Sequence, residues 1–158
     1  MSSYAVYKGN KYKLDVGEKI SLTSDSIESL KYGFEERKFS QGFISKVYYK
    51  KQVNKEDLED AYELEYKVIY KGKEFIPWAV GKFSLQDGDI ALGTNDYEIA
   101  SAYDFKKMEQ FVFKKDVPLE EIELLIEIKK HILQFKDLKD EITEIKNEDI
   151  KSYLSSLL

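Results

Sequence analysis

The chain has 158 residues, no cysteine and a formal net charge of −5, and 42% of its residues are hydrophobic. This content can supply the core of one ordinary domain or of two small subdomains, which excludes a disordered chain. The lack of cysteine excludes disulfides, thiolate nucleophiles and Cys-ligated zinc. No apolar run approaches the roughly 18 residues that span a bilayer, and the N-terminal stretch lacks a signal-peptide pattern, so we expect a cytoplasmic protein without membrane contact.

The negative charge is unevenly distributed along the chain. Residues 116–151 contain eleven Asp or Glu and six Lys, whereas residues 1–115 contain nineteen acids and nineteen bases. Proteins that bind polyanions more often show a basic excess. We therefore expect a protein partner, with nucleic acid less favoured.

A phrase near the N-terminus occurs twice. Tyr7-Lys8-Gly9 aligns with Tyr70-Lys71-Gly72 at an offset of 63 residues, and Lys50-Lys51 aligns with Lys114-Lys115 at an offset of 64. Anchors in the same order suggest a tandem duplication covering about residues 4–64 and 67–128. The alternative is that unrelated hairpins share the same turn chemistry.

Each phrase predicts a β-hairpin. Apolar and polar residues alternate on both sides of the glycine, and glycine at the first central position suits a type II′ turn. This placement would pair Tyr7 with Tyr12, and Tyr70 with Phe75. Further strands are expected around residues 20, 47, 90 and 111, so each unit is predicted to be an antiparallel meander.

A helix is expected to close each unit. Asn54 can cap the first helix, and Pro118 suits the first turn of the second. Leu58, Ala61 and Tyr62 have helical spacing, and Ile122, Leu125 and Ile126 repeat it. The opposite faces would be acidic, and we select from them these candidate partner-binding residues: Glu56, Glu59, Asp60, Glu63, Glu120, Glu123 and Glu127.

The C-terminal residues have no counterpart in the first unit. The stretch KKHILQFKDL is expected to prolong the second helix, and Asn147 can cap a final helix with Ile150, Tyr153 and Leu154 on one face. This apolar face can pack on its own chain or form a homodimer. The predicted fold is α+β: two repeats at 1–65 and 66–135, each a meander closed by a helix, and a helical extension at 136–158.

The sequence contains few signals of catalysis. His131 is the only histidine, and no triad pattern surrounds it. Asp87, Asp89, Asn95 and Asp96 faintly suggest a cation loop, but they lack the ligand spacing of an EF-hand, so we expect a turn and no metal. Phosphate-binding and nucleophile-elbow motifs are absent. We expect a non-enzymatic protein without a cofactor.

The Tyr-Lys-Gly phrases, the Lys- and Tyr-rich style, the lack of cysteine and the acidic helices together resemble immunity proteins of Gram-positive bacteria, which are encoded beside polymorphic secreted toxins. The resemblance implies an inhibitor whose acidic surface faces a basic cleft in a toxin domain. It carries over no fold and no individual residue. The alternative is a nucleic-acid-associated or phage-type accessory protein that uses its Lys- and Tyr-rich hairpins, although such lysines also suit a solvated strand face.

Overall fold

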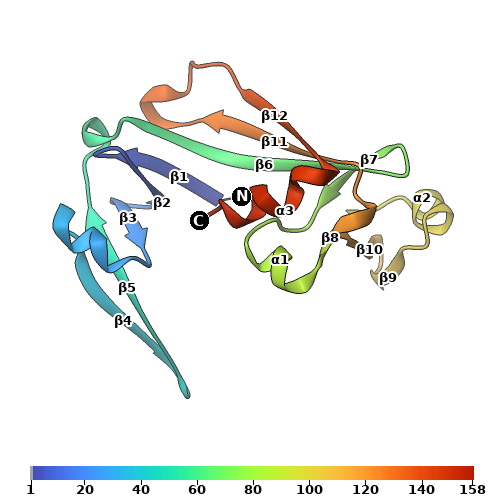
Figure 1. Cartoon of the computed structure of the whole chain (residues 1–158), viewed down its shortest axis with the longest axis horizontal. Helices are drawn as coiled ribbons and strands as arrows, with labels where there is room; N and C mark the ends of the chain where they lie inside the picture. The colour runs from blue at the N-terminus through green and yellow to red at the C-terminus, as the bar shows by residue number, and fades with distance from the viewer. Residues whose placement is uncertain (1) are drawn as a thin grey trace. The chain divides into compact units, whose positions relative to one another are not determined.

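The computed structural model describes residues 2–158, and its fold is mainly antiparallel β (Figure 1). Twelve strands are present in these residues, and the helices are short: α1 has five residues, and α2 and α3 have six each. The predicted α+β fold of meanders closed by helices is therefore wrong. Chain contacts divide the molecule into two units, which are described separately.

Unit 1 contains the residues up to Leu64 together with Lys129–Asp140. Its strands are hydrogen-bonded in the order β4-β5-β3-β2-β1-β6, and the 3-10 turns η1, η2 and η4 connect or follow them. The bounds are β1 (Ser2–Tyr7), β2 (Asn10–Val16), β3 (Ile20–Ser24), η1 (Ile27–Tyr32), β4 (Glu35–Gln41), β5 (Ile44–Gln52), η2 (Lys55–Asp57), β6 (Asp60–Tyr70) and η4 (Leu133–Phe135).

Unit 2 contains Glu65–Ile128 and Glu141–Leu158, so β6 passes from one unit into the other. Its strands follow the order β6-β7-β8-β10-β9, while β11 pairs with β6 and with β12. The bounds are β7 (Lys73–Pro77), α1 (Phe83–Asp87), β8 (Asp89–Thr94), α2 (Tyr97–Ala102), β9 (Lys106–Glu109), β10 (Val112–Pro118), η3 (Leu119–Glu121), β11 (Leu124–His131), β12 (Glu141–Lys146), η5 (Asn147–Asp149) and α3 (Ile150–Ser155).

Each unit has its own hydrophobic core. In unit 1 the core surrounds Ala5, Leu22 and Phe34. The segment Lys129–Asp140 packs against this core through Ile132, Leu133 and a further apolar residue. In unit 2 it surrounds Val68, Leu92 and Ile122, and α3 contributes Ile150 and Leu154. Successive side chains of a strand point to opposite faces of the sheet, so each short strand places alternate apolar residues in the core of its unit.

Both Gly-centred phrases form hairpins, but the turn differs from the one predicted. Tyr7 pairs with Asn10, so the central residues are Lys8 and Gly9, with φ of 49° and 78°. Lys71 and Gly72 repeat this with 48° and 74°. Positive φ at both central positions is typical of a type I′ turn, which places glycine second. The turn therefore begins one residue earlier than predicted, and Tyr12 pairs with Ala5, two residues away from its predicted partner Tyr7. Because a shift of two residues keeps both side chains on the same face, the two rings still lie 6.5 Å apart between centroids.

The two predicted closing helices are 3-10 turns followed by long strands. The structure has η2 and then β6 where the first helix was expected, and η3 and then β11 where the second was expected. In β6 the residues Tyr62, Leu64, Tyr66, Val68 and Tyr70 alternate with Glu63, Glu65, Lys67 and Ile69. This period of two over nine residues is typical of a strand, and it outweighs the short helical spacing at Leu58, Ala61 and Tyr62.

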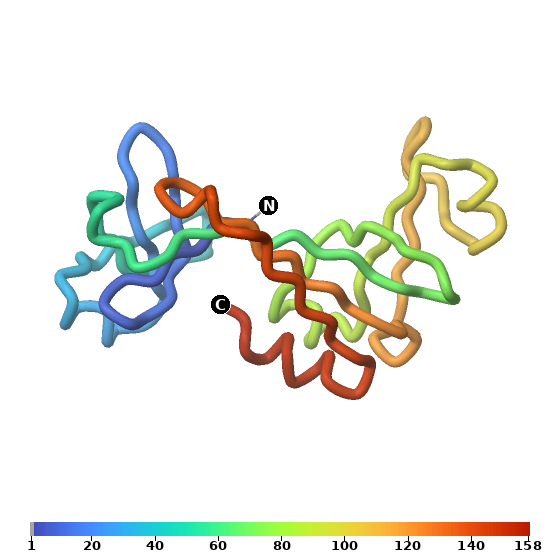
Figure 2. Tube along the Cα trace, turned by 90° about the horizontal axis from the view of Figure 1, so that it is seen from above, coloured from blue at the N-terminus to red at the C-terminus, as the bar shows by residue number. Residues whose placement is uncertain are grey.

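The strand pairings of one half of the chain recur in the other. The order β4-β5-β3-β2-β1-β6 becomes β9-β10-β8-β7-β6-β11 when every strand number is raised by five. Individual hydrogen bonds also recur: Glu59 donates its backbone N–H to Val6, and Glu123 does the same to Ile69. Strand β6 closes the first set and opens the second, and β6 and β11 run side by side (Figure 2).

The C-terminal segment is not a helical extension throughout. Residues 129–131 complete β11, η4 follows, and the stretch DEITEI forms most of β12. Only η5 and α3 lie where a final helix was expected. Ile150 and Leu154 of α3 are fully buried in the core of unit 2, and α3 lies beside α1.

Candidate functional site

Two of the candidate partner-binding acids support hairpin turns of the chain itself. Gly9 donates its backbone N–H to the Glu59 carboxylate at 2.8 Å, and Gly72 donates to the Glu123 carboxylate at 2.9 Å. Each turn glycine thus donates a hydrogen bond to a side chain about fifty positions further along the chain. Both glutamates remain exposed, so this role does not exclude a partner.

A third candidate, Asp60, is part of a partly buried network in unit 1. Its carboxylate lies 3.0 Å from His131 Nδ1 and 3.2 Å from Lys129 Nζ. The ammonium of Lys129 also lies 4.2 Å from the centroid of the Tyr62 ring, which stacks on Tyr4. Burial alone would raise the pKa of Asp60, but the hydrogen bonds from His131 and Lys129 outweigh it and hold this pKa below its ordinary value.

Glu127 belongs to a second network, in unit 2. It accepts a hydrogen bond from the Tyr153 hydroxyl, and this hydroxyl lies 2.8 Å from the Tyr66 hydroxyl. Burial raises the pKa of Tyr153, and the hydrogen bonds with Glu127 and Tyr66 raise it further. The network therefore holds α3 against the sheet through a phenol that stays protonated.

The remaining acidic candidates lie in simpler surroundings. Glu120 forms an exposed ion pair with Lys151 at 3.0 Å, Glu56 is exposed on η2, and Glu63 is partly buried on β6. The seven residues lie in strands, in 3-10 turns or, for Glu59 and Glu123, in the connection between a 3-10 turn and the next strand, so the acidic helix faces from which they were selected do not exist. Their role in binding a partner stays a prediction.

The residues of the suspected cation loop are distributed along one strand and its flanks. Asp87 ends α1 and Asp89 begins β8, whereas Asp96 caps α2 through hydrogen bonds from the backbone of Glu98 and Ile99. Gly88 adopts the left-handed conformation that ends α1. Residues 2–158 contain no cluster of three or more His, Asp or Glu side chains arranged to hold a metal ion.

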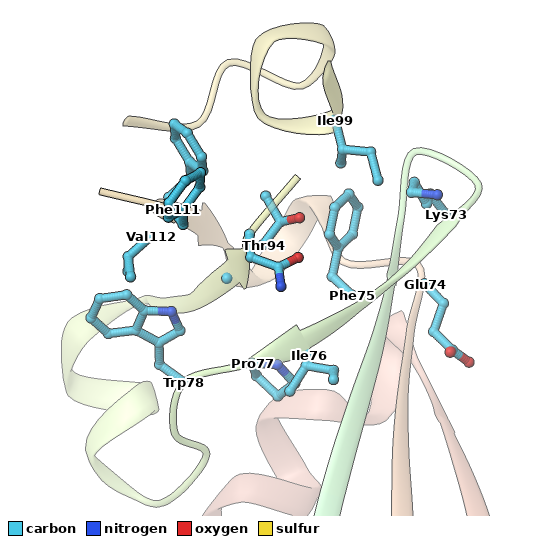
Figure 3. Close-up of a pocket in the computed structure, with 13 residues that line it drawn as sticks. Lys73, Glu74, Phe75, Ile76, Pro77, Trp78, Thr94, Ile99, Phe111 and Val112 are labelled. Carbon is cyan, nitrogen blue, oxygen red and sulfur yellow. The ribbon is translucent and has the colours of Figure 1, made fainter. Parts of the chain in front are cut away.

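A surface groove in unit 2 was not predicted from the sequence. It lies where β7 and β8 diverge: these strands pair only at Ile76 with Gly93 and at Pro77 with Leu92. Strand β8 continues along β10 as far as the pair Thr94–Phe113. The first three residues of β7 therefore have no ladder partner on the β8 side, and the fork holds a volume of about 480 Å³ (Figure 3).

The groove is mostly apolar. Ile76, Trp78 and Phe111 are 68%, 50% and 68% exposed, although they are among the most hydrophobic side chains. The remaining lining residues include Lys73, Glu74, Pro77, Thr94, Asn95, Ile99 and Val112. Apolar side chains gathered around an open fork with free strand edges are typical of binding sites rather than of a solvated sheet face.

Trp78 is held in the groove by a close contact with the sheet. A Cβ atom at Gly93 would lie 2.4 Å from Trp78 Nε1, so only glycine lets the indole lie this close to β8. The ammonium of Lys114 lies 5.2 Å from the indole centroid. The indole is therefore positioned by its surroundings before any ligand binds.

Phe111 stands at the groove in an unfavourable backbone conformation. Its φ is 62°, a left-handed value that is a genuine outlier for a bulky residue, and it occupies the turn between β9 and β10. Glycine would relieve this strain, so folding does not explain an exposed phenylalanine there. The clearest sequence signals for the groove are the extra residues around Trp78 in the second copy and the fact that Trp78 is the sole tryptophan.

The groove offers apolar surface and strand edges for binding. The fold and site define a mainly antiparallel β protein with an apolar surface groove. A family model matches residues 1–134, and the chain belongs to that family, which is described as uncharacterised conserved protein UCP033725. No curated protein and no solved structure matches the chain.

The structure describes no helix that is long and apolar enough to cross a membrane.

Proposed function

We propose that this chain is a non-enzymatic binding protein that holds an extended, apolar segment of a partner protein in the groove between β7 and β8. The observation that carries the proposal is the fork itself, where two neighbouring strands separate and leave backbone edges facing an apolar volume. An extended peptide can add to such an edge through main-chain hydrogen bonds, while its alternate side chains enter the apolar volume.

The groove supplies both affinity and selectivity. Full burial of one large apolar side chain contributes about 1.5–3 kcal/mol, and the exposed Ile76, Trp78 and Phe111 can each bury area against such a side chain. Because the Gly93 contact positions Trp78 in advance, little side-chain entropy is lost on binding there. We expect a peptide with alternating apolar residues to bind better than a charged one.

The sole tryptophan allows a direct test of this proposal. A library of peptides is screened against the whole protein, and each hit is titrated while the fluorescence of Trp78 is followed. We expect a blue shift on binding, and the variants Ile76→Ser and Phe111→Ser should each weaken binding about tenfold or more, the equivalent of 1.4 kcal/mol. Ile142→Ser is the matched control, because Ile142 is 65% exposed on β12 and does not line the groove.

The backbone part of the proposal has its own test. N-methylation at alternate positions of a hit removes N–H donors without removing side chains. One of the two alternating series should abolish binding, because only one series faces the strand edge. A library that yields no peptide, or hits whose binding is unchanged in both groove variants, would show that the groove is not the binding site.

An immunity protein that inhibits a cognate toxin is a more specific form of this proposal. Its support is the resemblance in sequence style, together with carboxylates such as Glu56 and Glu63 that have no assigned role in the fold. It expects a gene for a secreted toxin beside this one, and inhibition of that toxin by the purified protein. A neighbouring gene without a toxin domain would remove this form and leave the groove proposal in place.

A further inference from the structure

The hairpin β4–β5 of unit 1 extends beyond its sheet. Strand β3 pairs with β5 only from Tyr49 to Gln52, so the preceding residues of β5 pair with β4 alone. The result is a two-stranded ribbon, seen in Figure 1 as the long arrows of β4 and β5. The corresponding hairpin of unit 2 is shorter, because β9 has four residues where β4 has seven. The extra length therefore serves no pairing that the sheet requires.

Three large apolar side chains gather at the end of this ribbon. Phe39 and Ile44 are 51% and 70% exposed, and Phe43, in the turn, is fully exposed. The register pairs Phe39 with Lys46 and Gln41 with Ile44, so Phe39 and Ile44 point from the same face of the ribbon. An isolated ribbon is marginally stable in water, and exposed apolar residues at its end add nothing to its stability.

Behind the apolar end lies a basic collar, which we define as Arg37, Lys38 and Lys46. Residues 37–47 contain these three cations and no acid, in a chain whose net charge is −5. Lys38 and Arg37 are consecutive on the strand and therefore point from opposite faces, so the collar surrounds the ribbon. Arg37 and Lys46 lie 3.0 Å and 3.6 Å from Glu35 and Asp25, in exposed pairs that leave the cations accessible.

The spacing of the apolar end and the collar fits a lipid bilayer. At about 3.4 Å per residue, Lys46 lies about 10 Å behind Phe43 along the strand. Amphipathic helices that lie on a membrane bury their apolar face about 5–10 Å into the boundary between headgroups and acyl chains, and we take this depth for the end of the hairpin. Inserted end-on, Phe43 and Ile44 would reach that boundary while the collar stays at the height of the headgroups. A protein groove would instead require apolar residues along one face.

We propose that the β4–β5 hairpin docks this protein reversibly on anionic lipid surfaces. The apolar residues enter the bilayer and the collar pairs with the phosphates of the headgroups. This contact is peripheral, so it differs from the sequence expectation of no membrane contact, which considered only segments that span a bilayer. It does not depend on the groove of unit 2.

The test is sedimentation of the whole protein with vesicles of phosphatidylcholine alone and of phosphatidylcholine mixed with phosphatidylglycerol. We expect binding to the mixed vesicles to be stronger by about tenfold or more, and to be lost at about 1 M salt, where the Debye length is about 3 Å. The double variant Phe43→Ser/Ile44→Ser should bind neither vesicle. Lys38→Glu/Lys46→Glu should lose the preference for the anionic lipid.

Ile142→Ser serves as the control, because it removes an apolar side chain outside the hairpin whose exposed fraction, 65%, is close to the 70% of Ile44. Thermal unfolding of each variant establishes that it is folded. Failure to bind anionic vesicles, or binding that survives the Phe43→Ser/Ile44→Ser change, would overturn the proposal. So would a doubled mass in light scattering that this change abolishes, or retention of an oligonucleotide without retention of vesicles, because the occupant would then be a second copy or a nucleic acid.

Discussion

Two glutamates, Glu59 and Glu123, make the same hydrogen bonds in the two halves of the chain. Glu59 and Glu123 each follow a 3-10 turn, donate a backbone N–H to the first strand of a hairpin and accept a hydrogen bond from the glycine of its turn. A type I′ turn orients the N–H of its second central residue away from the ladder, where it needs an acceptor from elsewhere. The carboxylate supplies this acceptor, which explains why the same turn and the same acid occur together in both halves of the chain.

Replacement of these glutamates by lysine should lower stability. Lysine has no acceptor for the Gly9 or Gly72 N–H, and an exposed hydrogen bond of this kind contributes about 1 kcal/mol. We expect Glu59→Lys and Glu123→Lys each to lower the melting temperature by about 2–4 °C. Glu59→Gln should retain most of the stability because its amide oxygen still accepts, and Glu56→Lys is the matched charge control. Equal melting temperatures for Glu59→Lys and Glu56→Lys would refute this role.

The same residues show the limits of sequence reasoning at an acidic position. Glu59 and Glu123 align at the same offset of 64 residues as the Lys-Lys pairs, and the recurring hydrogen bonds explain this match. Their charge was predicted to lie on a helix face because Leu58, Ala61 and Tyr62 have helical spacing. The acceptor role depends on a contact about fifty residues away along the chain, and local spacing contains no information about it.

At the scale of elements, long strands replace the predicted closing helices. The alternation from Tyr62 to Tyr70 is visible in the sequence, but the acidic residues before it resemble the first turn of a helix, and a one-turn 3-10 segment satisfies that signal. The Gly-centred hairpins could be predicted because their turn chemistry is local. The groove could not be predicted, because it arises where the pairing of β7 with β8 stops. That point depends on how the strands pack in the folded protein and not on a local sequence pattern.

The attachment of α3 to unit 2 predicts a dependence of stability on alkaline pH. The pKa of Tyr153 is raised in the folded protein, so its phenol keeps a proton that the unfolded chain loses above a pKa of about 10. The stabilisation is therefore complete below that pH and decreases as the pH rises further. Tyr153→Phe should lower the free energy of unfolding at neutral pH by about 1 kcal/mol, since the hydrogen bonds are lost.

The variant should also lose less stability than the wild type between neutral pH and pH values above about 10, because it lacks the phenol that titrates. Urea denaturation at the two pH values measures both effects. Tyr97→Phe is the control, because Tyr97 is 72% exposed. An identical alkaline loss in the wild type and in Tyr153→Phe would show that the phenol of Tyr153 is not protected.

For the whole molecule, the chain builds two units from one strand plan. The recurring order of pairings places Leu22 on β3 and Leu92 on β8 in matching positions, and both side chains are fully buried. The two residues belong to different cores, one in each unit. The same substitution at the two matching positions should lower the free energy of unfolding by similar amounts. The part of the chain that opens should differ, because the two residues lie in separate cores.

Leu22→Ala and Leu92→Ala test this organisation. Removal of a fully buried leucine side chain costs about 2–5 kcal/mol, and we expect the two variants to lose similar amounts because both sites are closed. Hydrogen exchange followed by mass spectrometry should then separate them. Leu22→Ala should speed exchange mainly in β1–β5 and in residues 129–140, and Leu92→Ala mainly in β7–β10 and α3, because opening begins in the core that has lost contacts. Faster exchange to the same extent throughout the chain in both variants would contradict two separate cores, and would mean that the recurring pairings unfold as a single cooperative structure.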